Sequence, residues 1–268
     1  MADPEASGNP PRRGARGRRV AALIALVLGV AGFVISGTGT AIQLLPRRFS
    51  AAQQQQIENW EIAGRWQQLT AGQIFPASVS YQLSATVLQD ATSLNLNALR
   101  VAIAPQSGCG TGVTTAAASV LRHDGCKAVL RATYVDATWS YVMTVGVAVL
   151  PSAAAAASAH QSLTQPRLIA ANQSEAGRLA AGILVVRYHG TAAAMYDYSR
   201  QISASFAAGP YLVMYAAGYA DSRPRVPVAS DHYAYAEMTS LADGVAQSVE
   251  GTLAAPPASP HCPGTPGC

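Results

Sequence analysis

The chain has 268 residues, of which half are hydrophobic and 12% are charged, and its formal net charge is +4. This composition excludes an intrinsically disordered protein, because there are enough apolar residues to bury a core. Five arginines precede residue 20, whereas the chain from Pro46 onward carries 13 basic and 12 acidic residues. A nearly neutral domain lacks the basic surface that binds nucleic acid, so no nucleic-acid partner is expected.

The segment 20–45 contains no charged residue and is interrupted by only four uncharged polar side chains. A helix needs about 20 apolar residues to cross the roughly 30 Å hydrocarbon layer, so this run predicts one transmembrane helix. Five arginines precede the run, and only Arg47 and Arg48 follow it closely. The positive-inside rule therefore predicts a single-pass protein of the cell membrane, with its N-terminus in the cytoplasm and its C-terminal part outside.

Residues 1–19, which are rich in Pro, Gly and Arg, are expected to form a disordered cytoplasmic tail. A cleaved signal peptide is an alternative for segment 20–45, but its apolar region is usually about 7–15 residues and ends at a small-residue cleavage site. A buried core helix is a second alternative, although such a helix rarely stays free of charge over this length. The sequence favours an uncleaved anchor whose first partner is the lipid bilayer.

Residues 46–72 are interpreted as a stalk or linker helix, because Ile57 and Trp60 fall at helical spacing. An extracytoplasmic domain is expected over 73–252. The remaining residues, 253–268, form a tail rich in Pro, Gly and Cys.

All four cysteines follow the apolar segment, which suits an oxidising compartment. Cys109 and Cys126 flank a predicted helix over 112–123 and both adjoin glycine, so they are expected to form a disulfide that stabilises the fold by about 3 kcal/mol. Cys262 and Cys268 lie in the tail at a spacing that matches no zinc pattern. A local disulfide and two free thiols both stay open for this pair, and no metal or cofactor is expected.

Strands are predicted over 76–83 and 97–105, followed by a hairpin over 127–152. In the second arm of this hairpin, large and small side chains alternate from Tyr141 to Val149. This alternation is typical of a central antiparallel strand that is covered on both faces, with the small residues allowing a helix to approach closely.

An alanine-rich helix is predicted over 152–163. A second hairpin region follows, with a strand over 183–190 and a strand pair over 200–221. The last element is an amphipathic helix over 231–253, with Ser230 as its N-cap. The order of elements predicts an α+β fold, in which an antiparallel sheet of hairpins is packed by helices and preceded by one transmembrane helix. The repeated order of hairpin and helix also suggests a weak internal duplication.

Four runs carry a resemblance to other sequences: NWEIAGRWQQLTAGQIFP, RVAIAPQSGC, CKAVLRATYVDATWSYVMTVGVAVLPS and YLVMYAAGYADSR. They lie between about Ile57 and Val249 and resemble a group of uncharacterised actinobacterial membrane-anchored proteins with one transmembrane helix. The resemblance implies the single-anchor topology and a bridge between Cys109 and Cys126, and it implies no activity.

The chain contains no nucleophile elbow, phosphate-binding glycine loop, dinucleotide fingerprint or zinc-binding HExxH pattern. The acid–base candidates are scattered along the sequence and are His123 with Asp124, Asp136, His160, His189, Asp231 with His232, and Glu237. Asp124 and Asp136 are interpreted as turn residues, and Asp231 is interpreted as an acid at a helix start. No catalytic residue is predicted, and the sequence favours a protein that is not an enzyme.

Eight tyrosines in the second half of the chain allow two interpretations: they line a ligand groove or a partner surface, or they pack within the sheet. They are Tyr188, Tyr196, Tyr198, Tyr211, Tyr215, Tyr219, Tyr233 and Tyr235.

Three functions are therefore weighed. The leading hypothesis is an interaction or accessory domain that binds another envelope or secretion protein. The second is a ligand-binding or sensing domain with a tyrosine-lined groove. The third is an unrecognised cell-envelope hydrolase, which requires at least two of His123, Asp136, His189 and His232 in one cleft.

Overall fold

The computed structural model describes residues 50–83, 93–165, 182–186, 200–221, 223–224, 226 and 230–257. The predicted tail 1–19, the predicted anchor 20–45, and Cys262 and Cys268 lie outside these residues. Within the described part of the chain, no helix is both long enough and apolar enough to span a bilayer.

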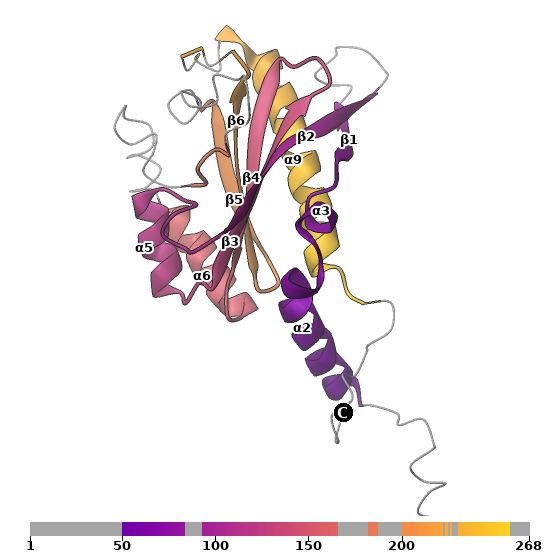
Figure 1. The fold of residues 1–268 in the computed structure, drawn as a ribbon, viewed down its shortest axis with the longest axis vertical. Helices are drawn as coiled ribbons and strands as arrows, with labels where there is room; N and C mark the ends of the chain where they lie inside the picture. The colour runs from indigo at the N-terminus through magenta and orange to yellow at the C-terminus, as the bar shows by residue number, and fades with distance from the viewer. Residues whose placement is uncertain are drawn as a thin grey trace, which may run out of the picture. The chain divides into compact units, whose positions relative to one another are not determined.

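Six antiparallel strands form one curled sheet in the spatial order β1-β2-β3-β4-β6-β5 (Figure 1). The strands are β1 (Ser78–Leu83), β2 (Leu94–Ser107), β3 (Ala128–Asp136), β4 (Tyr141–Val149), β5 (Ile202–Ala208) and β6 (Tyr211–Tyr219). The helices are α2 (Ala51–Gln68), α3 (Ala71–Ile74), α5 (Thr115–His123), α6 (Ala153–Leu163) and α9 (His232–Ala254). The predicted α+β class, an antiparallel sheet packed with helices, is confirmed.

Helix α9 crosses one face of the sheet, and helices α5 and α6 pack on the other (Figure 1). The first face contributes the large side chains of β4, from Met143 to Val149, to a core cluster with Met238, Leu241 and Val245 of α9. Every residue of β4 after Tyr141 is buried, which confirms the prediction of a central strand covered on both faces. The large side chains therefore face the longest helix.

On the other face of β4, Ala148 packs in one cluster with residues of α5 and α6, as predicted, whereas Gly146 has a different role. A Cβ atom on Gly146 would lie 2.1 Å from Cδ1 of Ile183, which is closer than two carbon atoms can approach. Gly146 thus makes room for a side chain of the segment 182–186, and this segment is not a helix.

The prediction of a strand over 183–190 is wrong for residues 183–186, which are the part of this range that the structure describes. Ile183 makes a single isolated bridge with Val113, and the next three residues are not in a strand. Side chains of the sheet bind the main chain here, since Arg131 Nη1 donates to the carbonyl of Leu184 at 2.8 Å and Thr133 donates to that of Val186 at 2.9 Å. The segment therefore crosses a sheet face, which buries its apolar residues as a strand would.

The suggested duplication is not reflected in the arrangement of the helices. Helix α6 follows the hairpin β3–β4, and helix α9 follows the hairpin β5–β6. The two helices pack on opposite faces of the sheet, so the repeated order does not give repeated units.

The sequence predicted Ser230 as the N-cap of α9, and this prediction is wrong, because the N-cap is Asp231. The Asp231 side chain accepts a hydrogen bond from the amide of Ala234 at 3.3 Å and another from the Tyr219 hydroxyl at 2.5 Å. Because Tyr219 ends β6 beside Tyr141, the start of α9 is tied to the end of the sheet where β3 turns into β4. We call this the Asp136 end of the sheet, and the opposite end of β3 the Cys126 end.

Candidate functional site

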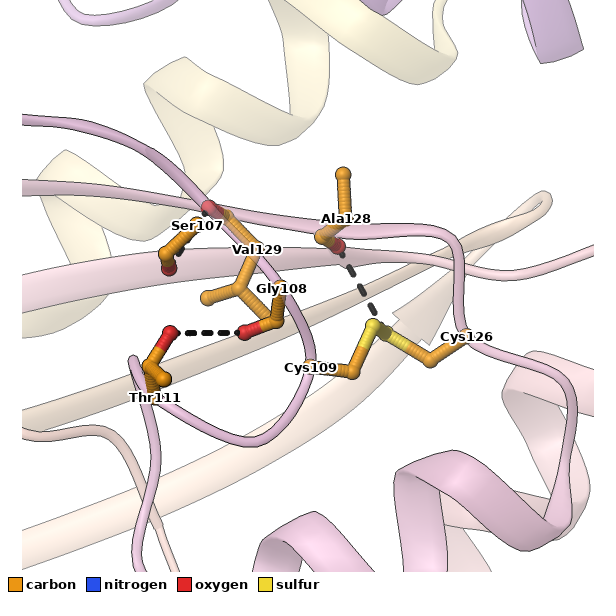
Figure 2. The surroundings of a disulfide bond; sticks show 7 residues. All are labelled: Ser107, Gly108, Cys109, Thr111, Cys126, Ala128 and Val129. Carbon is orange, nitrogen blue, oxygen red and sulfur yellow. Dashed lines mark hydrogen bonds between the residues drawn. A yellow bond between two sulfur atoms is a disulfide. The ribbon is translucent and has the colours of Figure 1, made fainter.

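A disulfide joins Cys109 and Cys126, as predicted (Figure 2). The two Cα atoms are 6.1 Å apart, within the range that a disulfide can bridge. The bond closes the loop that carries α5, and Figure 2 also shows the Thr111 hydroxyl donating to the carbonyl of Gly108 inside this loop. No free cysteine is present among the described residues.

The histidines that the structure describes lie at separate places. His123 ends α5 with its side chain 86% exposed, and its Nδ1 is 3.4 Å from Oδ1 of the adjacent Asp124. His160 of α6 pairs with the Ser205 hydroxyl at 3.2 Å. Asp136 is the last residue of the nine-residue β3, which spans about 27 Å, and His123 lies before its first residue. The two side chains therefore do not meet. His189 lies outside the described residues.

Asp136 is a turn residue, as predicted. Its buried carboxylate accepts hydrogen bonds from the amide of Thr138 at 2.9 Å and from the amide of Tyr141 at 2.6 Å. These bonds close the turn between β3 and β4, in which Trp139 has a φ of 58°. The carboxylate thus fixes a left-handed backbone position that a tryptophan rarely adopts.

Three of the predicted tyrosines are structural ties beneath α9 and α2. Tyr211, Tyr215 and Tyr219 are at most 7% exposed. The Tyr215 hydroxyl donates to Asp243 of α9 at 2.7 Å, and burial together with this carboxylate raises its pKa. These three rings are therefore buried in the domain and do not line an exposed groove. Tyr188, Tyr196 and Tyr198 lie outside the described residues.

Tyr233 and Tyr235 differ in their surroundings. Tyr233 is 41% exposed, and its ring centroid is 3.9 Å from that of His232. Tyr235 is buried, and its hydroxyl donates to the carbonyl of Val226 at 2.6 Å.

A cluster of acidic and tyrosine side chains lies under the first half of α9, at the Asp136 end. Glu237 of α9 accepts a hydrogen bond from Tyr141, and burial followed by the charge of Asp136 raises the pKa of Glu237. Tyr81 of β1 is 4% exposed, and its hydroxyl has no hydrogen-bond partner among the described residues. Burial, then the charges of Asp136 and Glu237, raise the pKa of Tyr81. A proton is therefore held at Glu237 more tightly than on an ordinary glutamate.

No group of three potential metal-ligating side chains is found in the part of the chain that the structure describes. The cluster contains two carboxylates and two phenols, and among the described residues these carboxylates form no such group with a histidine or cysteine. The cluster can hold a proton, but the described residues place no nucleophile beside it.

Helix α2 is attached to the domain by its second half. Arg65 Nη1 donates to the carbonyls of Leu253 at 3.2 Å and of Ala255 at 2.6 Å, where α9 ends. The Tyr211 hydroxyl donates to the carbonyl of Ile62 at 2.5 Å and accepts from the amide of Trp66 at 3.4 Å. This carbonyl and this amide are four residues apart, the spacing of one helical hydrogen bond. These contacts lie at the Cys126 end of the sheet. These contacts have no local signal in the sequence, because they join residues more than 140 positions apart.

No family model, no curated protein and no solved structure matches this chain. The resemblance to actinobacterial membrane-anchored proteins therefore stays a prediction.

The described surface has hollows beside β2 and beside β1. One, of about 280 Å³, lies between the end of α2, helix α3 and strand β2, and apolar side chains such as Trp66, Phe75 and Ile103 line it. The other, of about 810 Å³, runs between strand β1 and helix α9 and is lined mainly by hydroxyl and amide groups. The second hollow is large enough for a ligand or a peptide segment.

Proposed function

We propose that this chain is a membrane-anchored extracytoplasmic interaction domain, whose α2 helix holds the domain in a defined orientation for a partner protein of the envelope. The observation that carries the proposal is the attachment of α2. A flexible linker would need no contact with the domain, whereas α2 is bound both to the end of α9 and to the core strand β6.

The chemistry of the α2 attachment supports a fixed orientation. The last carbonyls of a helix have no partner within it and carry partial negative charge, so the guanidinium of Arg65 satisfies both needs at the end of α9. On the other side, Ile62 and Trp66 pack against the main core cluster. Two different parts of the domain therefore hold the same two turns of α2.

The disulfide supports the proposed compartment. Disulfides persist in extracytoplasmic compartments and are rare in the cytosol. The bond between Cys109 and Cys126 therefore agrees with the orientation predicted from the arginines that flank segment 20–45.

The two other hypotheses have less support from the described residues. A hydrolase needs convergent groups, and His123 lies beyond the end of β3 that is opposite Asp136. Asp136 lies at the same end of the sheet as His232, and its carboxylate accepts the amides of Thr138 and Tyr141 in the turn. A tyrosine-lined groove needs exposed rings, and Tyr211, Tyr215 and Tyr219 are buried in the core.

The proposal is tested by crosslinking the full chain in intact cells and identifying partners by mass spectrometry after membrane purification. A reproducible envelope partner is expected for the native chain. A version in which residues 1–45 are replaced by a cleavable secretion signal is the control, and it should lose most of that crosslinking because the tether is gone. The absence of any partner that recurs between replicates would remove the proposal.

The same cells test the orientation. Protease added outside should digest the domain, and thiol labelling should shift the mass at Cys109 and Cys126 only after reduction. Protection of the domain in intact cells, with digestion after lysis, would reverse the proposed topology.

A further inference from the structure

Strand β1 is an edge strand that borders the 810 Å³ groove. Its only sheet neighbour among the described strands is β2. The strand wall of the groove is formed by five consecutive residues, Ser78 to Gln82. The helix wall is formed by Ser240, Asp243, Gly244, Gln247 and Ser248. A strand edge and a polar helix flank therefore face the same space.

The main chain of β1 offers hydrogen-bonding groups to this space. The amide of Arg100 donates to the carbonyl of Ala77 at 2.9 Å, so residue 77 directs its polar groups toward β2. In an antiparallel pair, successive residues of a strand alternate between facing the partner and facing away. The residues that face away from β2 are Ser78, Ser80 and Gln82, and no backbone hydrogen bond to their amides or carbonyls is found among the residues that the structure describes.

Strand β1 lacks the features that usually protect an edge. Its sequence, SVSYQL, contains no charged residue and no proline, and its register with β2 has no bulge. The six residues span about 20 Å, which is the length of an ordinary strand.

The lining of the groove disfavours other classes of ligand. Asp243 is the only charged residue among the described lining residues, so nothing there attracts phosphates or anionic lipids. Tyr81 is the only aromatic residue in that lining among the described residues, and it is 4% exposed with its Cβ next to Gly244, so it offers no flat face to a sugar or a base. Hydroxyl, amide and main-chain groups remain, and they suit the main chain of a peptide.

We infer that the β1–α9 groove binds an extended segment of a partner polypeptide, which pairs with the open edge of β1 as an added strand. Main-chain hydrogen bonds to Ser78, Ser80 and Gln82 supply binding that depends little on sequence. The side chains of Asp243 and Gln247 lie on the helix wall and select among partner residues. This inference rests on the proposed function and names the chemistry of its partner.

The test uses the purified full chain in lipid nanodiscs and a phage library of random peptides. Peptides enriched over empty nanodiscs are synthesised, labelled and titrated by fluorescence anisotropy. The variant Ser80→Pro removes one outward amide and keeps every bond to β2, because proline is tolerated on the open side of an edge strand. We expect it to weaken peptide binding by about tenfold or more, since a partner carbonyl loses its donor.

Ser80→Ala is the matched control. The Ser80 hydroxyl donates to Asn97 at 2.8 Å, and both variants lose this bond, but only the proline variant loses the amide. Ser80→Ala should bind the peptides within about twofold of the native chain, because its main-chain donor is intact. Equal binding by the native chain and Ser80→Pro, or a panning that enriches no peptide, overturns the inference.

A second pair of variants covers the case in which Ser80→Pro does not fold. Gln247→Trp fills the groove from an exposed position on α9, and Thr239→Trp places the same side chain on an exposed part of α9 outside the lining. Only Gln247→Trp should abolish peptide binding. Equal loss in both variants, or in neither, counts against the groove.

Two further outcomes separate this inference from the proposed function. A concentration-dependent dimer of the full chain, measured by light scattering and removed by Ser80→Pro, would assign the edge to a second copy and overturn the peptide assignment. An envelope partner that crosslinks equally to the native chain and to Ser80→Pro would leave the tethered interaction role standing and remove the groove as its site.

Discussion

Glu237 shows how one carboxyl depends on its neighbours. Burial, followed by the nearby charge of Asp136, raises the pKa of Glu237, and the hydrogen bond from Tyr141 opposes this shift only in part. A raised pKa means that the folded state binds the proton more tightly than the unfolded chain does. The protonated group therefore contributes stability below the pKa of the unfolded chain, and that contribution is lost as the pH rises through the folded-state pKa.

The variant Glu237→Gln should be more stable than the native chain near neutral pH, because glutamine keeps the acceptor for Tyr141 without the charge beside Asp136. We expect the melting temperature to rise by about 2 °C near pH 7 for a domain of this size. The difference should shrink to nothing below about pH 4, where the native carboxyl is protonated. Thermal unfolding followed by circular dichroism across this pH range measures it.

The control for this prediction is Glu250→Gln, which makes the same charge change about three and a half turns along α9. An equal gain from both variants at neutral pH would mean that net charge, and not the contact with Asp136, is responsible. A gain for Glu237→Gln that is constant from acid to neutral pH would contradict the prediction.

Asp231 caps α9 and also accepts the Tyr219 hydroxyl, and this second bond is the main cause that lowers the pKa of Asp231. Asp231→Ala should lower the free energy of unfolding by about 1–2 kcal/mol, because an N-cap and a partly buried hydrogen bond are lost together. Ser230→Ala should change it by less than about 0.5 kcal/mol, as for a surface substitution. Urea denaturation measures both, and equal losses would restore Ser230 as a cap.

At the scale of elements, the disulfide is the clearest case of a feature that both sequence and structure support. Removing it in Cys109→Ser with Cys126→Ser should lower the free energy of unfolding by about 3 kcal/mol, since the closed loop spans 17 positions. Calorimetry should record a fall in melting temperature of about 6–10 °C.

The native chain measured with a reductant is the matched control for the double variant, because it lacks the same bond without a change of sequence. The two samples should melt together. A native chain whose melting temperature ignores the reductant would show that the bond is absent in solution.

Several elements could be predicted because their patterns are local. Strands β4 and β6 alternate large and small side chains, and α9 has an apolar stripe, so their types follow from spacing alone. The segment 182–186 could not be assigned in this way. Its apolar residues are buried as in a strand, but side chains of the sheet, such as Arg131 and Thr133, take the place of a neighbouring strand.

The candidate site was less predictable than the fold. The contact between Glu237 and Tyr141 joins α9 to β4, and the groove beside β1 exists because α9 lies against Tyr81. Neither has a local signal, because each depends on which elements become neighbours. Asp136 was predicted correctly as a turn residue, since an aspartate binds the main chain two residues ahead of it wherever it starts a turn.

At the scale of the whole molecule, the position of α2 depends on Tyr211. Tyr211→Phe keeps the buried ring and removes the hydroxyl that binds Ile62 and Trp66. We expect a loss of about 1 kcal/mol in the free energy of unfolding and faster hydrogen exchange of the amides in α2. Exchange in α9 should stay unchanged, and mass spectrometry resolves the two helices.

Tyr215→Phe is the control, because the hydrogen bond that it breaks joins β6 to Asp243 of α9 and not to α2. It should leave the exchange of α2 unchanged. If Tyr211→Phe and Tyr215→Phe affect α2 equally, the attachment does not run through the Tyr211 hydroxyl.

The double attachment of α2 also has a mechanical consequence. Arg65 binds the last turn of α9, whereas the main chain of Ile62 and Trp66 binds the hydroxyl of Tyr211, the first residue of β6. A pull applied along α2 is therefore shared by two elements that lie side by side, and both contacts must rupture together before the helix separates. The domain should thus respond to tension as one body up to that rupture, which a single-molecule force measurement would record as one abrupt step.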